Sequence, residues 1–217
     1  MADYFPMFIE IKNKSCLVVG GGRIALHKVK VLKDFGVQIM VVAPMIMPEI
    51  QEMKDVVCCE RHFEKEDLKG QAMVIAATDD KELNHRISQA CREEKIPVNA
   101  VDQPEDCSFI FPAYLKEGEV VAAFSSGGQS PVVTQYLKEQ MRPVMTPLLG
   151  NLAERLGSLR EKVRQINPAK ARKKIYQEIL QAGFDKGEIP SDEEIEEIIK
   201  SCKISRKSEI MTDEPYL

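Results

Sequence analysis

The sequence lacks the features that mark membrane, secreted and metal-binding proteins. Its 217 residues contain no apolar run near the ~18 residues that a membrane-spanning helix needs. The N-terminal segment has neither the basic region nor the long apolar core of a signal peptide. The six cysteines form no Cys-x-x-Cys pair and lie mostly in apolar patterns, which favours buried thiols over a zinc or iron–sulfur site. We therefore expect a cytoplasmic protein that does not contact membranes.

An excess of charge of one sign is also missing. The chain has 30 Lys and Arg against 34 Asp and Glu, a net charge of −4, so its charge balance does not predict nucleic-acid binding. The three histidines, His27, His62 and His85, lie on three different predicted elements. Because no spacing of His, Cys or Asp is typical of a preformed metal site, we predict no resident metal.

A glycine-rich turn stands between a predicted strand and a predicted helix. Residues 16–19 form a short apolar strand that runs directly into Gly20-x-Gly22-x-x-Ala25. Gly20 allows the tight turn, Gly22 lets the backbone approach a pyrophosphate, and Ala25 lets the helix pack closely on the strand. The N–H groups at the helix N-terminus then face the phosphates. Such a turn can be merely a turn, but its strand–helix context favours a dinucleotide site.

Strands and helices alternate over the first half of the chain. Besides a weakly alternating stretch at 7–11 that suggests a leading strand, the pattern predicts strands at 15–20, 37–43, 56–62, 72–77 and 97–101 and helices at 22–35, 47–54 and 80–94. Strands that are apolar on both faces and alternate with helices are typical of parallel sheets. The sequence therefore predicts an α/β fold with a Rossmann-like, doubly wound parallel sheet.

The pattern changes after Asp102. Short strands, predicted to be antiparallel, follow at 108–112, 114–115 and 120–124, and Ser130 and Pro131 are typical of a helix start. From about residue 148 only helical patterns remain, including helices at 168–181 and 191–202.

Several stretches together resemble the precorrin-2 dehydrogenase / sirohydrochlorin ferrochelatase module of siroheme synthases. They are 16–25, 41–44 (Val-Val-Ala-Pro), 76–80 (Ala-Ala-Thr-Asp-Asp), 99–102 (Asn-Ala-Val-Asp), 108–112 (Ser-Phe-Ile-Phe-Pro) and 125–131 (Ser-Ser-Gly-Gly-Gln-Ser-Pro). The resemblance implies oxidation of precorrin-2 to sirohydrochlorin with NAD. In many members it also implies insertion of ferrous iron, as a substrate, to give siroheme.

The resemblance also implies a division of the chain and a homodimer. We expect an NAD-binding Rossmann-like domain over 1–112, a dimerisation segment over 113–147, a helical domain over 148–205 and a disordered tail over 206–217. Short strands with a single helix cannot bury much surface alone, which agrees with a segment that pairs with a second copy.

The expected cofactor is NAD. The residues assigned to it are Gly20, Gly22, Arg23, Ile24, Ala25, Pro44, Met45 and Thr78. The second strand ends in Pro44 and Met45 without the acid that usually binds the ribose, which weakens the assignment on physical grounds; the family that the chain resembles has Ala-Pro there. No basic residue stands beside this strand to favour NADP. Arg23 either reaches a phosphate or is a solvated helix residue, and Asp80 is expected to cap the next helix rather than bind.

Asp102 is the predicted catalytic residue. It follows the fifth strand, where a carboxylate is well placed for acid–base chemistry, although it could simply cap a loop. The resemblance implies that it serves both oxidation and metal insertion. The residues assigned to the tetrapyrrole are Asn99, Ser125, Ser126, Gly127 and Gln129. Asn99 would orient Asp102 or the substrate, the loop N–H groups would hold carboxylates, and Ser126 matches a position that some members phosphorylate.

Two alternatives remain open at this stage. The basic stretch over 155–174 either binds a polyanionic tetrapyrrole or is a solvated face. The chain as a whole could be a nucleotide-sensing regulatory module without catalysis. That alternative predicts an acid at the end of the second strand and has no need of Asn99 and Asp102.

Overall fold

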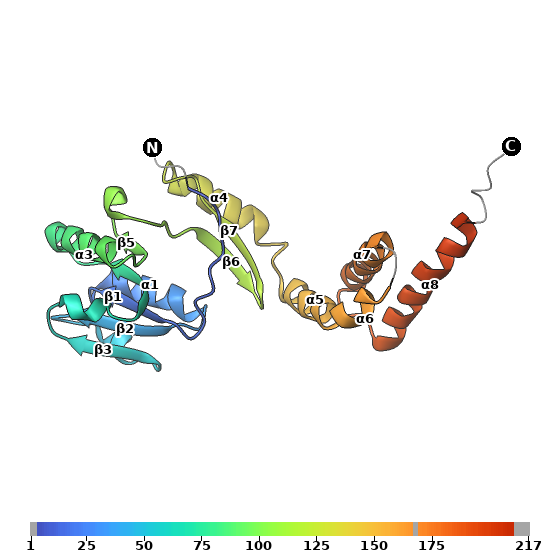
Figure 1. The fold of residues 1–217 in the computed structure, drawn as a ribbon, viewed down its shortest axis with the longest axis horizontal. Helices are drawn as coiled ribbons and strands as arrows, with labels where there is room; N and C mark the ends of the chain where they lie inside the picture. The colour runs from blue at the N-terminus through green and yellow to red at the C-terminus, as the bar shows by residue number, and fades with distance from the viewer. Residues whose placement is uncertain (1–3, 167–168, 211–217) are drawn as a thin grey trace. The chain divides into compact units, whose positions relative to one another are not determined.

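The computed structural model describes residues 4–166 and 169–210. The chain divides into two compact units (Figure 1). The first runs to Phe111 and includes Gly127–Gln129, and the second holds the rest. The main border therefore lies beside the predicted boundary at 112. The further division into a dimerisation segment and a helical domain stays a prediction.

Five parallel strands form the sheet of the first unit. They are β1 (Ser15–Val19), β2 (Gln38–Ala43), β3 (Val56–Glu60), β4 (Gln71–Ala76) and β5 (Val98–Ala100). They pair in the order β3-β2-β1-β4-β5, with Val18 opposite Val41 on one side and Ile75 on the other. This order is that of a Rossmann-like sheet, so the predicted fold class is confirmed.

Helices cover both faces of this sheet because successive strand residues point to opposite sides. On one face Cys16 and Val18 pack with α1 (Arg23–Lys33) and α2 (Pro48–Gln51). On the other face Leu17 and Val19 pack with α3 (Lys81–Glu93) and the short helix η1 (Lys65–Leu68). Burial raises the pKa of Cys16 to about 11. All six cysteines are free; three of them are buried, as predicted, whereas Cys58, Cys59 and Cys107 are only partly buried.

Two predicted strands are wrong. Residues 7–11 form no strand, and Met7 and Phe8 are exposed, because a weakly alternating segment becomes a strand only where it finds a neighbour to pair with. Residues 108–112 are also not a strand, because Ser108 and Phe109 bond to β5 through single contacts rather than a ladder.

The second unit begins with an antiparallel hairpin of β6 (Ala113–Glu117) and β7 (Val120–Phe124), as the sequence predicts. Helix α4 (Pro131–Met141) follows, capped by Ser130. The remaining helices are α5 (Pro147–Ser158), α6 (Arg160–Arg164), α7 (Ala169–Lys186) and α8 (Asp192–Ile210). Their core contains Val163, Ile175, Ile179, Ile195 and Ile199.

Helix α8 extends further than expected. It ends at Ile210 rather than 202, so it includes 206–210 of the predicted tail. The rest of that tail, 211–217, lies outside the described residues. Over the part of the chain that the structure describes, no helix combines the length and apolarity that crossing a membrane requires.

Candidate functional site

The first part of the site is the turn between β1 and α1. Gly20 has a φ of +124°, and a Cβ there would overlap the carbonyl oxygen of Ala77. A Cβ on Gly21 would overlap the carbonyl oxygen of Met45, whereas a Cβ on Gly22 would meet no atom within 4 Å. Packing therefore requires Gly20 and Gly21, while Gly22 leaves open space. The role of Gly21 was not predicted from the sequence, because the motif places no condition on that position.

The N-terminus of α1 lies behind this open space. Its N-cap residue, Gly22, offers no side-chain hydrogen bond, and its first turn contains no acid. Uncapped N–H groups at the start of an 11-residue helix attract an anion. Arg23 and Ile24 are exposed beside them, whereas Ala25 is fully buried against the sheet. This arrangement fits the pyrophosphate of a dinucleotide, with the backbone as donor.

Pro44 and Met45 follow β2 at the same edge of the sheet. Both are exposed, Met45 by 83%. The N–H of Met47 donates to the carbonyl of Gly21 at 2.9 Å, which ties this loop to the glycine turn. Since β2 ends at Ala43 without an acid, backbone groups and the Met45 side chain are what this loop offers to an adenosine.

Thr78 stands after β4, next to the glycine turn. Its hydroxyl donates to Oδ1 of Asn84 at 2.7 Å, and it accepts from the N–H of Asp80 at 3.2 Å. Asp80 caps α3, because its carboxylate accepts the N–H groups of Glu82 and Leu83, both at 3.0 Å. The capping role predicted for Asp80 is thus confirmed, and Thr78 is held in place before any ligand binds.

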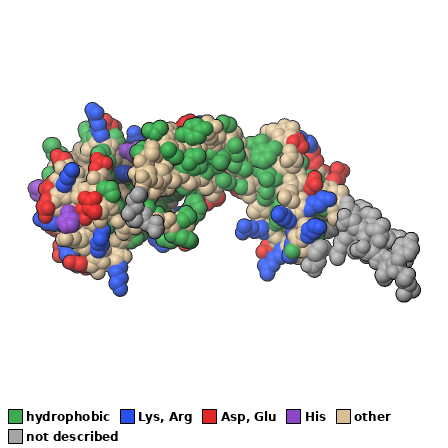
Figure 2. Space-filling model, turned by 90° about the horizontal axis from the view of Figure 1, so that it is seen from above, with side chains coloured by type: hydrophobic (Ala, Val, Ile, Leu, Met, Phe, Trp, Pro, Cys, Tyr) green, Lys and Arg blue, Asp and Glu red, His purple; other side chains and the backbone are tan. Residues whose placement is uncertain are grey.

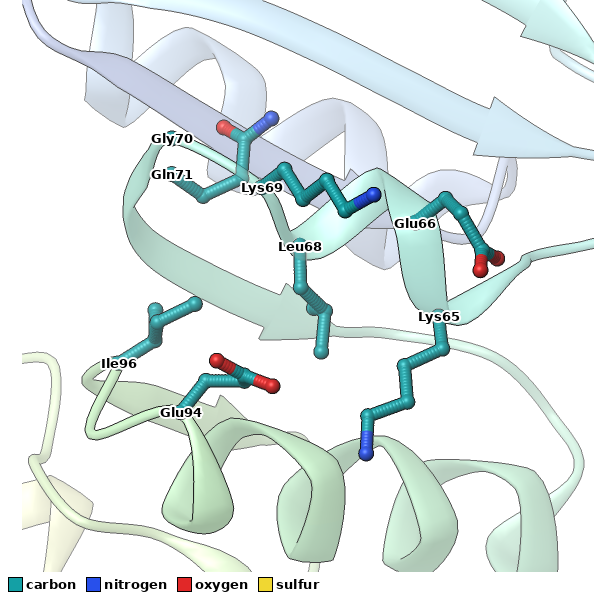
Figure 3. Close-up of a pocket in the computed structure, with 8 residues that line it drawn as sticks. All are labelled: Lys65, Glu66, Leu68, Lys69, Gly70, Gln71, Glu94 and Ile96. Carbon is teal, nitrogen blue, oxygen red and sulfur yellow. The ribbon is translucent and has the colours of Figure 1, made fainter.

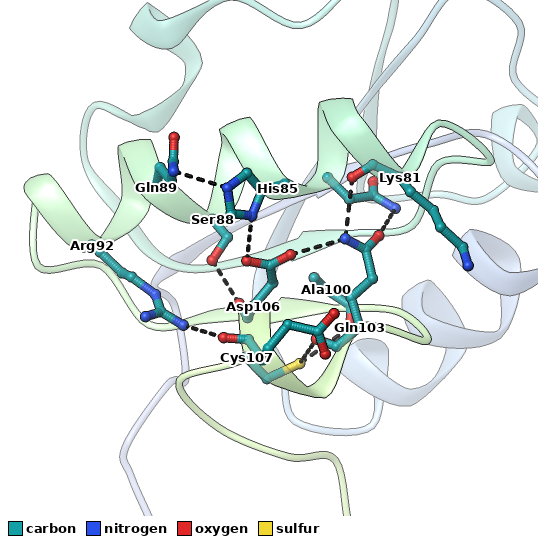
Figure 4. A network of polar contacts seen from close by, with 11 residues as sticks. Lys81, His85, Ser88, Gln89, Arg92, Ala100, Gln103, Asp106 and Cys107 are labelled. Atoms are coloured by element: carbon teal, nitrogen blue, oxygen red, sulfur yellow. Dashed lines mark hydrogen bonds and ion pairs between the residues drawn. The ribbon is translucent and has the colours of Figure 1, made fainter.

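Asp102 stands two residues after β5 with an exposed side chain. Its φ is +58°, in the left-handed region that Asp tolerates better than most residues. The N–H of Val101 before it donates to the carbonyl of Ala76 on β4 at 2.9 Å. The side chain of Gln103 after it is buried in a polar network below the loop (Figure 4). The carboxylate is therefore presented on a short loop that is fixed on both sides.

Asn99, predicted to touch the substrate or Asp102, lies in the sheet instead. It is 8% exposed, and its Nδ2 donates to the carbonyl of Phe109 at 3.0 Å and to Sγ of Cys107 at 3.4 Å. These bonds hold the segment after the Asp102 loop against β5. Direct contact of Asn99 with a ligand stays a prediction, and the observed bonds give it a supporting role.

Lys28 is a charged neighbour of this site that sequence reasoning missed. It lies on α1, and its Nζ is 4.1 Å from the centroid of the Phe111 ring, a cation–π distance. Burial lowers the pKa of Lys28, while the charges of Cys107 and Asp102 raise it. Burial raises the pKa of the Cys107 thiol. The only signal in the sequence is the helical position of Lys28, one turn after the fingerprint.

The loop over 125–129 lies between β7 and α4. Oγ of Ser126 donates to the carbonyl of Ser130 at 3.0 Å and accepts its N–H at 2.9 Å, which closes the loop. Gly127 and Gly128 both have positive φ, +62° and +83°, and the side chains of Ser125 and Gln129 are exposed. Consecutive N–H groups of such a loop are suited to binding an anion.

The structure thus brings together one part of the predicted site. The turns after β1, β2, β4 and β5 meet at the carboxyl edge of the sheet, where ligands bind in open α/β sheets. The loop over 125–129 is shared between the two units, because Gly127–Gln129 belongs to the first and the residues before it to the second.

The basic stretch at 155–174 has more acidic partners than its neighbours in sequence suggest. Arg155 pairs with Asp192 and Lys162 with Glu196, both acids belonging to α8. Only tertiary packing supplies these partners, so part of this positive charge is neutralised within the second unit.

A hollow of about 500 Å³ lies away from the site (Figure 3). It is lined by Lys65, Glu66, Leu68, Lys69, Gly70, Gln71, Glu94 and Ile96. Gly70 and Gln71 stand at the start of β4, so the hollow is at the opposite edge of the sheet from the carboxyl ends. Lys65 is paired with Glu93 at 2.7 Å, and the mixed charges of the hollow favour no ligand class. Within the described residues, no three or more His, Cys, Asp or Glu residues are grouped to hold a metal ion.

Comparison with known proteins identifies relatives of the chain. Residues 7–113 match the NAD_binding_7 family, described as "Putative NAD(P)-binding". The chain is similar to the siroheme synthase of Thioalkalivibrio sulfidiphilus, with 38% identity over 82% of this chain and 37% of the relative. It is 39% identical to that of Nitrosomonas europaea over 75% of this chain and 35% of the relative. The chain therefore spans little more than a third of these curated relatives.

A solved structure agrees with the sequence comparison. The structure of "SirC, precorrin-2 dehydrogenase" matches with a TM-score of 0.72 and 26% identity, over 92% of this chain and 99% of that chain. Its likeness extends over both units. The resemblance expected from the sequence motifs is therefore confirmed.

Proposed function

Because the chain belongs to the family of siroheme synthases and precorrin-2 dehydrogenases, we propose that it oxidises precorrin-2 to sirohydrochlorin in the cytoplasm. NAD is the cofactor. The observation that carries the proposal is one edge of the sheet that holds both an uncapped helix N-terminus and an exposed carboxylate. Gly22 leaves the space for the pyrophosphate, and Asp102 stands on the loop after β5.

The two groups have separate tasks in a dehydrogenation. NAD held at the glycine turn would supply the acceptor for a hydride, that is, for a hydrogen with the electron pair of its bond. A second hydrogen leaves the macrocycle as a proton, and the electrons of its bond form the new double bond. The carboxylate of Asp102 takes that proton.

The substitution Asp102→Asn tests this proposal because it keeps the size of the side chain and removes the base. We expect turnover of precorrin-2, followed by tetrapyrrole absorbance, to fall about 10²- to 10⁴-fold. The affinity for NAD, measured by calorimetry, should change less than about twofold. Turnover within about threefold of wild type, under ~1 kcal/mol of barrier, would remove Asp102 from the chemical step.

Asp55→Asn is the matched control. Asp55 is also exposed with a positive φ, +67°, but it precedes β3 at the opposite edge of the sheet. The Asp55→Asn substitution should therefore leave the turnover of precorrin-2 unchanged.

Ferrous iron is a second substrate in this proposal. Removal of two pyrrole protons accompanies iron insertion, and Asp102 is the base at the carboxyl edge that could accept them. The nitrogens of the macrocycle, rather than a cluster of side chains, would then hold the iron. An anaerobic assay with sirohydrochlorin and ferrous iron decides the point: siroheme formation supports a bifunctional enzyme, and its absence leaves the oxidation alone.

The substrate's carboxylate arms are assigned to the loop over 125–129. The support is its backbone, which turns twice through positive φ at Gly127 and Gly128 and is closed by the Ser126 hydroxyl. Gln129→Ala and Ser125→Ala should raise KM for precorrin-2 more than they lower kcat.

A homodimer through 113–147 completes the proposal. Helix α4 has no buried residue, although it carries many apolar side chains. Those that are exposed on it are Val132, Val133, Tyr136, Leu137 and Met141. Hydrophobic side chains also gather around this segment in Figure 2. An exposed apolar face of this kind is typical of a protein–protein interface, and we propose a second copy of the chain as the partner that covers it.

A further inference from the structure

Two buried amide side chains connect the loop after β4 to the loop that carries Asp102. Asn84 on α3 is 1% exposed, and Gln103 is 7% exposed. Oδ1 of Asn84 accepts the N–H of Thr78 at 3.3 Å and its hydroxyl at 2.7 Å. Nδ2 of Asn84 donates to the carbonyl of Thr78 at 3.1 Å and to Oε1 of Gln103 at 3.2 Å. One amide therefore bonds to both loops at once.

The other end of this chain of bonds is a buried carboxylate. Nε2 of Gln103 donates to Oδ2 of Asp106 at 2.9 Å and to the carbonyl of Lys81 at 3.1 Å (Figure 4). Asp106 is 5% exposed, and its other oxygen lies 2.7 Å from Nδ1 of His85. The hydroxyl of Ser88 donates to the carbonyl of Asp106 at 2.6 Å. Two residues of α3 therefore hold Asp106, His85 at its carboxylate and Ser88 at its backbone carbonyl.

The carboxylate determines the direction of every bond in the chain. An ionised carboxylate and a carbonyl can only accept, so Gln103 must turn its NH₂ group toward Asp106 and Lys81. The oxygen of Gln103 then faces Asn84, so Asn84 must donate to it from its own NH₂ group. The oxygen of Asn84 is left for Thr78. A buried network that is fully satisfied in one direction is rigid, because reversing one amide would face oxygen against oxygen.

Asp102 lies between the fixed points of this network. The backbone before it is held by the bond from Val101 to Ala76, and the residue after it is Gln103. Its left-handed conformation costs energy and persists only where the surroundings impose it. Gln103, through its buried side chain, supplies that constraint.

We infer that Gln103 and Asn84 are positioning residues that set the place of the Asp102 carboxylate relative to the cofactor loop at Thr78. The inference rests on the proposed role of Asp102. Neither amide touches the substrate; each acts through Asp102. Because hydride and proton leave the same macrocycle, the two loops must keep a fixed spacing, and a shift of about 1 Å can cost about a hundredfold in rate.

Gln103→Glu is the direct test. It preserves shape but puts an oxygen against Asp106 and the Lys81 carbonyl. We expect kcat to fall about tenfold to a hundredfold, with the Kd for NAD within about threefold. Gln103→Met removes the same bonds without adding charge, so it serves if the Glu variant does not fold. Gln38→Glu, the same change at an exposed position at the start of β2, is the control and should leave kcat unchanged. An unchanged kcat in folded Gln103→Met would overturn the inference.

A double-mutant cycle separates positioning from general damage. If Gln103 acts through Asp102, Gln103→Met should lower kcat less than about twofold in an Asp102→Asn background. An equal fall in both backgrounds would mean a structural role and would overturn the inference while leaving the role of Asp102 intact. Wild-type turnover of Asp102→Asn alone would instead overturn the proposed function, and the inference with it.

The direction of the bonds is tested by exchanging the two end groups. In the double variant Gln103→Glu, Asp106→Asn, the new amide at 106 can donate to the new carboxylate at 103, whose second oxygen still accepts from Asn84. We expect this variant to recover part of the kcat lost in Gln103→Glu but not all of it, because the Lys81 carbonyl still faces an oxygen at 103. No recovery would show that the order of donors and acceptors is not what holds Asp102.

Discussion

The guanidinium group of Arg61 makes two hydrogen bonds to the carboxylate of Asp67, at 2.8 and 2.5 Å. The side chain of Asp67 is 6% exposed and that of Arg61 41%. The same carboxylate accepts the N–H of Glu64 at 2.9 Å, so it also caps η1. These bonds hold η1 in place just before β4, the strand that leads to Thr78.

Loss of this pair should destabilise the first unit. We expect Asp67→Asn to lower the free energy of unfolding by about 1–3 kcal/mol, the range for leaving buried partners unpaired, with Arg61's exposure keeping the effect below that of a fully buried pair. Glu66→Gln, a neighbouring exposed position, should change it by less than about 0.5 kcal/mol. Urea denaturation measures both. Equal stability of Asp67→Asn and wild type would mean that the pair contributes nothing.

Asp67 also predicts a pH dependence. The hydrogen bond and charge of Arg61 lower the pKa of Asp67 below its usual 3.8. A lowered pKa means that the folded state holds fewer protons than the unfolded state, so the contribution is present above about pH 4 and is lost as the pH falls toward the folded pKa. The acid-induced loss of stability should therefore be smaller in Asp67→Asn than in wild type below pH ~4.

Lys28 should titrate below its usual pKa of 10.5, since burial is the largest influence on it. Removing the nearby negative charge with Asp102→Asn should lower the pKa of Lys28 further, whereas Asp55→Asn should not. Because the folded state loses its proton first, this group makes unfolding free energy rise with pH between the folded pKa and 10.5. NMR titration of the Lys28 side chain measures the shift. An unchanged value in Asp102→Asn would show that the two groups do not interact.

Gly22→Asp should abolish NAD binding, because it places a side chain and a negative charge in the open space at the N-terminus of α1. The protein should still fold, since a Cβ there meets nothing. Gly21→Ala should instead affect folding: its Cβ would clash with the carbonyl oxygen of Met45, and we expect the free energy of unfolding to fall by about 1–3 kcal/mol. Calorimetry measures the NAD affinity of Gly22→Asp, and thermal unfolding measures the stability of both variants. Unchanged NAD affinity in folded Gly22→Asp would exclude this turn as the pyrophosphate site.

Tyr136→Glu should convert the proposed dimer to a monomer, because a charge on the apolar face of α4 would have to be buried in the interface. Tyr136 is 61% exposed in one chain, and so is Val57 on β3. Val57→Asp in the first unit is therefore a control that should leave the dimer intact. Light scattering at micromolar concentration gives the mass of each. A monomeric wild type would contradict the proposal.

Local patterns determined the elements that carry the cofactor. The apolar strand, the three glycines and the amphipathic helix lie within about twenty consecutive residues, and their periodicity and turn chemistry require no distant partner. The cap at Asp80 and the β6–β7 hairpin follow from equally short stretches. The prediction of a leading strand at 7–11 was wrong because a strand needs a neighbour to pair with, and a local pattern does not specify that neighbour.

The side-chain contacts of the site were decided only by the tertiary structure. Asn84 and Gln103 are 19 positions apart, and Lys28 lies more than seventy positions before Asp102. Arg155 finds Asp192 only because α5 and α8 belong to one packed unit. Asn99, which has the residue type of a ligand contact, is committed to Phe109. Sequence periodicity determines which face of an element is buried, but the neighbour that each polar group meets there depends on how the elements pack.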